Sequence, residues 1–202
     1  MNGTREQLAK IIVARSYLHR DQPGDEPIRL ASGKTSTFYF ECQKTTRFAE
    51  AMPMIGRLVI ERLVGTPQFV GGLASGADPI AQAVAHTSLE TGRVIDSFSV
   101  RKERKPHGTM RWIEGCAEPG SDVLLVDDVI TSGGSVIKAI ERCAEENLRI
   151  LQVVVLGDRE QGGLQAIKDR LPGTPVEAIF TKSDLDEVAA RERGRPFDSG
   201  VD

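Results

Sequence analysis

Two kinds of polar residue stand side by side in the stretch VLLVDDVITSGGSV, residues 123–136. Its second half, TSGGS, combines glycines with hydroxyl side chains, a composition suited to a loop that wraps around a phosphate. Directly before this half stand two carboxylates, Asp127 and Asp128, which would repel a phosphate. The stretch therefore predicts a ligand with a phosphate at one end and hydrogen-bond donors at the other.

A ribose 5-phosphate unit meets both requirements. A loop this short would hold one phosphate, and the sequence lacks both the GxxxxGK[ST] and the GxGxxG patterns of nucleotide-binding loops. Ribose hydroxyls donate well to ionised carboxylates, which would also stabilise positive charge at C1 of the sugar. A turn that merely caps a helix would explain one aspartate and one serine, but not the whole string. The expected phosphate contacts are Thr131, Ser132, Gly133, Gly134 and Ser135.

A basic segment, RKERKPHGTMRWIEG at residues 101–115, contrasts with the net charge of −3 and the pI near 5.7 of the whole chain. This local excess of Lys and Arg predicts an anionic ligand, although a solvated charged loop would have the same composition. Proline and glycine occur without any apolar period, so we expect a mobile loop over about residues 101–115.

Three adjacent aromatic residues, Phe38, Tyr39 and Phe40, end the stretch SGKTSTFYF. They could belong to a buried strand, or to a hood that holds a flat ring. Farther along, Arg159 follows an apolar run at 151–156. An arginine at a strand end can pair in two-pronged fashion with a carboxylate, although many such arginines only form surface ion pairs.

The elements that position these residues follow from the apolar pattern. Strand-like runs near 69–73, 94–100, 123–126, 151–156 and 176–180 alternate with helical stretches near 79–90, 136–148 and 164–171. This order predicts an α/β fold with a mostly parallel sheet and helices on both faces, whose ligands bind at the carboxyl ends of the strands. We expect further helices near 4–19 and 48–64 and short extended pieces near 28–31 and 38–41. The prediction is one domain over residues 1–202, with an N-terminal hood over about 1–45.

Composition excludes several other classes of protein. The acidic balance argues against a nucleic-acid partner. No apolar run approaches the ~20 residues that cross a membrane, and the N-terminus does not read as a secretory signal. Three cysteines without CxxC spacing indicate reduced thiols, and hence a cytoplasmic protein.

The string VLLVDDVITSGGS resembles the signature by which type I phosphoribosyltransferases bind phosphoribosyl diphosphate: an apolar strand, two acidic residues, then T-x-G-G/T-[ST]. The resemblance implies that Val129 and Ile130 join the loop and the aspartates in binding this substrate. It also implies Mg2+ that is held mainly through the diphosphate and the ribose hydroxyls, with no direct protein ligand.

The basic segment is similar to the R-K-E-x-K-x-H-G catalytic loop of orotate phosphoribosyltransferases. The resemblance implies that Lys105 is the main catalytic lysine, that Lys102 and His107 assist it together with the aspartates, and that these cations and Arg101 bind the pyrophosphate. It further implies a homodimer in which the loop reaches the active site of the neighbouring subunit.

The aromatic stretch resembles the S-G-x-x-S-x-[YF]-[YF]-[FYI] segment of the same family. This implies that Tyr39 and Phe40 contact orotate, that Arg159 binds its carboxylate, and that Thr131 also touches the base.

Two positions depart from the family pattern. Ala31 stands where members often have lysine, and Lys34 could supply that charge instead. Ser75 and Gly76, within GGLASGADPIA, replace a common Tyr-Lys pair. This glycine-rich turn can still offer backbone amides to a pyrophosphate, so we expect both residues to bind the diphosphate substrate.

The predicted activity is the transfer of the phosphoribosyl group to orotate, giving orotidine 5′-phosphate and pyrophosphate in pyrimidine synthesis. One alternative is a phosphoribosyltransferase for another base, but a neutral purine has no carboxylate for Arg159. The other is a regulator that binds the diphosphate without turnover. The retained Lys105 and His107, and the absence of a basic recognition helix in the N-terminal region, argue against it.

Overall fold

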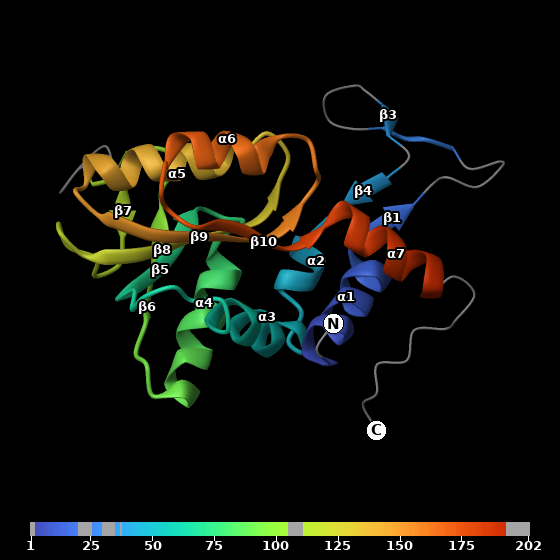
Figure 1. Cartoon of the computed structure of the whole chain (residues 1–202), viewed down its shortest axis with the longest axis horizontal. Helices are drawn as coiled ribbons and strands as arrows, with labels where there is room; N and C mark the ends of the chain where they lie inside the picture. Colours follow the sequence, from blue (N-terminus) through green and yellow to red (C-terminus); the bar gives the residue numbers. More distant parts are fainter. Residues whose placement is uncertain (1–2, 20–25, 30–34, 37, 105–110, 193–202) are drawn as a thin grey trace.

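A six-stranded sheet forms the centre of the computed structural model, which describes residues 3–19, 26–29, 35–36, 38–104 and 111–192 (Figure 1). All neighbouring strands are parallel except for the edge pair β6 and β7. The α/β architecture with a mostly parallel sheet is therefore confirmed. In sheet order the strands are β10 (Val176–Thr181), β9 (Arg149–Asp158), β8 (Asp122–Ile130), β5 (Phe69–Leu73), β6 (Asp96–Val100) and β7 (Ile113–Glu114).

Helices cover both faces of this sheet (Figure 1). Side chains along β8 alternate between the two hydrophobic cores, as a strand buried on both faces requires. Val123 and Leu125 pack into the core that includes α5 and α6, whereas Leu124 and Val126 pack into the core that includes α3 and α4. The bounds of these helices are α3 (Ala51–Ile60), α4 (Asp78–Ser88), α5 (Gly134–Glu145) and α6 (Gly163–Arg170), and the short η1 (Leu89–Thr91) follows α4.

The first and last described helices meet beside β10. There the N-terminal helix α1 packs against the C-terminal helix α7 (Figure 1). The Arg5 guanidinium donates to the Ile179 carbonyl at 3.0 Å and to the Asp184 carboxylate at 2.8 Å, which ties α1 to both β10 and α7. The elements of this region are α1 (Gly3–Arg15), β1 (Tyr17–His19), β4 (Phe38–Phe40), α2 (Gln43–Thr46), α7 (Lys182–Glu192) and the antiparallel pair β2 (Ile28–Arg29) and β3 (Thr35–Ser36).

Several predicted boundaries were wrong. Strand β8 continues to Ile130 instead of ending at Val126, because its ladder with β9 runs on to the pair Ile130–Asp158. The predicted helix over 4–19 ends at Arg15, because Tyr17–His19 pairs with β4 as a strand. No helix was predicted where α7 lies. Within the described part of the chain, no helix combines the length and the apolarity needed to cross a bilayer.

Candidate active site

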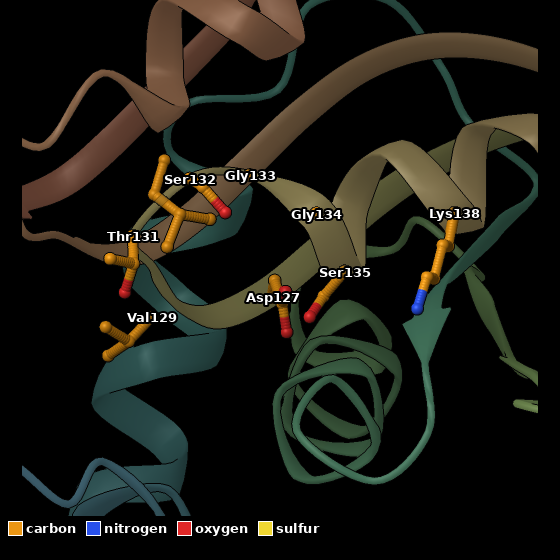
Figure 2. A pocket seen from close by; sticks show the side chains of 9 residues that line it. Asp127, Val129, Thr131, Ser132, Gly133, Gly134, Ser135 and Lys138 are labelled. Atoms are coloured by element: carbon orange, nitrogen blue, oxygen red, sulfur yellow. The ribbon is translucent and has the colours of Figure 1, made fainter. Parts of the chain in front are cut away.

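The carboxyl ends of β5 and β8 lie side by side at the point where the strand order reverses. The chain leaves β5 for α4 on one face of the sheet and leaves β8 for α5 on the other. Such a switch point opens a crevice in which α/β proteins bind ligands. A pocket of about 310 Å³ lies at the end of β8 (Figure 2). Its lining residues are Asp127, Val129, Ile130, Thr131, Ser132, Gly133, Gly134, Ser135 and Lys138.

The TSGGS turn forms the wall of this pocket at the start of α5. Gly133 has a φ of +79°, a left-handed conformation that favours glycine, and α5 begins at the next residue. The first N–H groups of a helix have no partner within it and carry the positive end of its dipole. Figure 2 shows the Ser135 hydroxyl and the Asp127 carboxylate lining the same pocket, with Thr131 and Ser132 farther along the same turn. The pocket therefore combines anion-binding amides with hydroxyl donors.

The two aspartates lie within the last part of β8 and are both largely buried. The Asp128 amide donates to Asp127 Oδ1 at 3.0 Å, and the Val129 amide donates to Asp128 Oδ1 at 2.7 Å. Burial, together with the neighbouring Asp128 charge, raises the pKa of Asp127 to about 7. Burial also raises the pKa of Asp128. A ligand that donates hydrogen bonds here would favour the ionised carboxylates.

The turn after β5 packs directly against both carboxylates. A Cβ atom on Gly76 would lie 2.9 Å from Asp128 Oδ1 and 3.2 Å from Asp127 Oδ1. Any larger residue at this position would have to displace an aspartate. Ser75 is exposed beside it, after a cis peptide bond that joins it to Ala74. The structure thus brings the Ser75–Gly76 turn and the acidic pair together at one end of the crevice.

The basic segment is described only at its two stems, residues 101–104 and 111–115. Lys105 and His107 lie outside the described residues. The Arg101 amide donates to the Trp112 carbonyl at 2.9 Å, and the Arg101 guanidinium forms an ion pair with Glu114 and not with the phosphate pocket. The predicted loop over 101–115 was too long at its end, because Ile113–Glu114 forms strand β7 against β6.

The last turns of α5 hold both stems. Arg142 donates to the Lys102 carbonyl at 2.6 Å. Lys102 is an exposed residue. Arg104 and the Trp112 indole both donate to Glu145 Oε2, at 2.6 and 2.7 Å. One helix therefore carries the phosphate turn at its start and the anchors of the basic segment near its end.

The predicted base contacts gather at the end of β9. A Cβ atom on Gly157 would lie 2.7 Å from Phe40 Cε1, so the Phe40 ring packs against the bare backbone of β9. The Arg159 guanidinium lies 4.6 Å from the centroid of the Phe38 ring. Side chains alternate along β4, so Tyr39 points away from this face and is 37% exposed. The structure brings Phe40 and Arg159 to one place and puts Phe38, rather than Tyr39, with them.

Arg159 has hydrogen-bonding capacity to spare. Its backbone N–H donates to the Ile130 carbonyl at 3.1 Å, which places it next to Thr131. Its Nε atom is buried and has no hydrogen-bond partner among the described residues. A buried donor of this kind is costly unless a ligand satisfies it. Ala31 and Lys34, where the sequence departs from the family pattern, lie outside the described part of the chain.

Sequence reasoning missed several residues at this site. Lys138 lines the phosphate pocket, and its position three residues after Ser135, one helical turn along, could have revealed it. Gly163 supports the phosphate turn, since a Cβ there would lie 2.6 Å from the Thr131 carbonyl oxygen. Glu160 and Ser183 form a hydrogen bond across a separation of 23 residues, which no local sequence pattern predicts.

Comparisons with known proteins agree with this geometry. The phosphoribosyl transferase domain family matches residues 55–177, which begins after β4 and ends before α7. The orotate phosphoribosyltransferase of Aquifex aeolicus (strain VF5) is 40% identical over 183 residues, covering 90% of this chain and 97% of the relative.

Solved structures give the same result. The Mycobacterium tuberculosis H37Rv orotate phosphoribosyltransferase in complex with Fe(III) dicitrate superposes with a TM-score of 0.79 at 33% identity, covering 90% of this chain and 98% of that one. The same enzyme in complex with 5-phospho-alpha-D-ribosyl 1-diphosphate gives a TM-score of 0.75 at 30% identity, covering 91% and 99%. Pocket, fold and relatives lead to one conclusion: the chain belongs to the orotate phosphoribosyltransferase family.

Proposed function

We propose that phosphoribosyl diphosphate binds with its 5′-phosphate on residues 131–135 and its ribose hydroxyls on Asp127 and Asp128. The observation that carries this assignment is one pocket with a helix N-terminus on one wall and a buried carboxylate on the other. The diphosphate of the substrate would then lie toward the Ser75–Gly76 turn, which touches the same carboxylates. The M. tuberculosis relative was solved in complex with this diphosphate, which supports it as the ligand.

Orotate would bind between Phe40 and Arg159, with Thr131 beside it. The buried Nε of Arg159 and the rest of its guanidinium can pair in two-pronged fashion with the orotate carboxylate. The Phe40 ring, fixed against Gly157, offers a flat apolar surface to the pyrimidine. Tyr39 faces away from Arg159. Its proposed contact with orotate would therefore require the base to lie on the opposite face of β4.

The reaction then follows from charge. A ring nitrogen of orotate bonds to C1 as the bond from C1 to the pyrophosphate oxygen breaks, and the electron pair leaves with pyrophosphate. The proton of that nitrogen is released to solvent in the same overall exchange. Ionised Asp127 and Asp128 stabilise the positive charge that develops at C1. Lys105, assisted by Lys102, Arg101 and His107, would stabilise the negative charge that develops on pyrophosphate.

Two adjacent carboxylates at the ribose end suit a hard cation such as Mg2+, which prefers oxygen ligands and keeps several waters. We assign the ion mainly to the diphosphate and the ribose hydroxyls. When bound, it would neutralise charge on the leaving group.

The homodimer and the shared loop can be tested by complementation. Lys105→Ala and Asp127→Asn subunits, each inactive alone, would be mixed and allowed to exchange. If the loop acts on the neighbouring site, mixed dimers keep one complete site and the mixture recovers about a quarter of wild-type activity. No recovery after verified exchange would mean that each loop acts on its own subunit.

The activity itself is tested by following the ultraviolet absorbance of orotate with phosphoribosyl diphosphate and Mg2+. We expect a decline that needs all three components and disappears in Lys105→Ala. If orotate were inert while another base reacted, the base assignment would be wrong. If every base were inert, a diphosphate-binding regulator would be the better description.

We place the reaction in the cytoplasm, because the three cysteines are free thiols.

A further inference from the structure

The segment between β9 and α6 holds its second residue in an unusual backbone conformation. Glu160 has a φ of +58°, which few residues other than glycine adopt without cost. Its N–H donates to Asp158 Oδ1 at 2.9 Å. A conformation of this kind persists when surrounding contacts enforce it, so the contacts of the Glu160 side chain need an explanation.

Those contacts lead to the C-terminal helix. Glu160 Oε2 accepts one hydrogen bond from the Ser183 N–H at 2.8 Å and another from the Ser183 hydroxyl at 2.7 Å. Ser183 lies in the first turn of α7, where N–H groups lack partners within the helix and favour a negative charge. The carboxylate therefore joins the segment after β9 to the start of α7.

Helix capping alone does not account for this join. The first turn of α7 already has a reciprocal cap, in which the Asp184 N–H donates to Thr181 Oγ1 at 3.1 Å and the Thr181 N–H donates to Asp184 Oδ2 at 2.9 Å. Glu160 supplies a further acceptor from a different part of the chain. The result is a fixed distance between α7 and the residue that precedes Glu160.

That preceding residue is Arg159. Its backbone is held on one side by the Ile130 carbonyl and on the other by the Glu160–Ser183 contact. Its guanidinium lies over the Phe38 ring, and Lys182 of α7 places its Nζ 5.0 Å from the same ring centroid. The Arg159 guanidinium and the first turn of α7 therefore share the Phe38 ring as a neighbour.

We propose that Glu160 is a positioning residue for base recognition. Through its hydrogen bonds with Ser183 it holds Arg159 in the direction that receives the carboxylate of a pyrimidine carboxylic acid. The inference rests on the proposed role of Arg159. Groups that bind substrate must be held closely, and small displacements weaken binding strongly. We expect the effect to be confined to the base end, because the segment after β9 meets the phosphate turn at Gly163, three residues beyond Glu160.

Steady-state kinetics of four variants test the role of the Glu160–Ser183 contact. Glu160→Ala should raise KM for orotate roughly tenfold and leave KM for phosphoribosyl diphosphate within about twofold. Ser183→Ala removes one of two donors and should have a smaller effect in the same direction. Glu160→Gln keeps an acceptor oxygen and should restore most of the orotate affinity. Glu187→Ala changes an exposed glutamate on the same helix and should behave as wild type.

Combining Glu160→Ala with Arg159→Lys separates this inference from the proposed function. If Glu160 acts through Arg159, adding Glu160→Ala to Arg159→Lys should change the orotate KM little. Additive effects would show that Glu160 acts by another route, and the inference would be overturned. So would a lower unfolding temperature with both KM values unchanged, which indicates a purely structural role. If Arg159→Lys itself left orotate KM unchanged, the proposed base site would fail first.

Discussion

The phosphoribosyl end of the site takes its acidic pair and its phosphate turn from one continuous strand, turn and helix, residues 122–145. The base end takes its residues from β4, from the segment after β9 and from the start of α7, with more than a hundred residues between the first and the last. The matched domain covers the first region completely, but neither β4 nor α7.

This contrast separates two ways of holding a substrate. At the phosphoribosyl end the proposed binding groups are backbone amides and the carboxylates of buried Asp127 and half-buried Asp128, which secondary structure fixes directly. At the base end they are side chains whose placement depends on contacts between distant elements. Substitutions should therefore affect one substrate and spare the other, and four experiments examine that expectation.

The largest effect is expected for Gly163→Ala. Its new Cβ would lie 2.6 Å from the Thr131 carbonyl oxygen and 2.8 Å from the Gly133 nitrogen, so the phosphate turn must move. A shift of this size should raise KM for phosphoribosyl diphosphate about a hundredfold. Orotate KM should change much less. Gly3→Ala, whose Cβ would meet open space, serves as the control. An equal loss for both substrates would break the comparison.

The second experiment varies pH. The pKa of Asp127 is raised to about 7, so its ionised form, the better acceptor for ribose hydroxyls, grows between pH 6 and 8. KM for phosphoribosyl diphosphate should fall about tenfold over this window, while orotate KM should not share the trend. Because Asp127→Asn is expected to be inactive, the dissociation constant of phosphoribosyl diphosphate would be measured by titration for this variant and for wild type. In Asp127→Asn it should keep only the pH dependence that comes from the phosphate groups of the substrate. A profile that Asp127→Asn does not alter would contradict the assignment.

The same pKa has a consequence for stability. Because the folded protein holds the Asp127 proton more tightly than the unfolded chain, this carboxyl stabilises the fold below its ordinary pKa near 4. That contribution is lost as pH rises toward and through about 7. Asp127→Asn should therefore flatten the decline in unfolding temperature between pH 5 and 8, measured without substrate.

The third experiment is Gly157→Ala. Its Cβ would lie 2.7 Å from Phe40 Cε1 and should push the ring away from β9. We expect orotate KM to rise about fivefold, with little change for phosphoribosyl diphosphate. Adding Phe40→Leu should relieve the clash and recover thermal stability without recovering orotate affinity. Recovery of both would mean that the Phe40 ring is only a packing element.

The smallest effect is expected for Tyr17→Phe. Tyr17 is buried beneath Phe38 and Phe40 and donates to Asp186 of α7 at 2.6 Å. Loss of this hydrogen bond should reduce the free energy of unfolding by about 1 kcal/mol, measured with urea, because the buried Tyr17 side chain loses its contact with the half-buried Asp186 carboxylate. Asp186→Ala as background should remove most of the difference. Kinetics for the diphosphate should not change.

The two regions also differ in how well the sequence predicts them. The strand and turn at 123–135 were predicted nearly as they stand, because an apolar run followed by glycines and hydroxyls is a local signal. The strand was still drawn too short, since aspartates disfavour strands and only the partner β9 extends the ladder through them.

At the base end, local signals failed or pointed in two directions. Helix α7 buries Leu185, Val188 and Ala189, a three-residue face among charged neighbours that is too small to stand out. Which of Phe38, Tyr39 and Phe40 face Arg159 depends on the register with β1, because a strand inverts its faces when its register shifts by one. Family resemblance, rather than pattern, supplied Phe40 and Arg159.

The anchoring of the basic segment to α5 has an evolutionary consequence. Arg101 and Trp112 are hydrogen-bonded across its base, and Arg142 and Glu145 hold its two stems from one helix. Lengthening a chain segment between fixed ends costs only about 0.6 kcal/mol for each doubling. Insertions and deletions between the stems should therefore be tolerated by the fold, so the proposed catalytic cations there can vary while the scaffold stays the same.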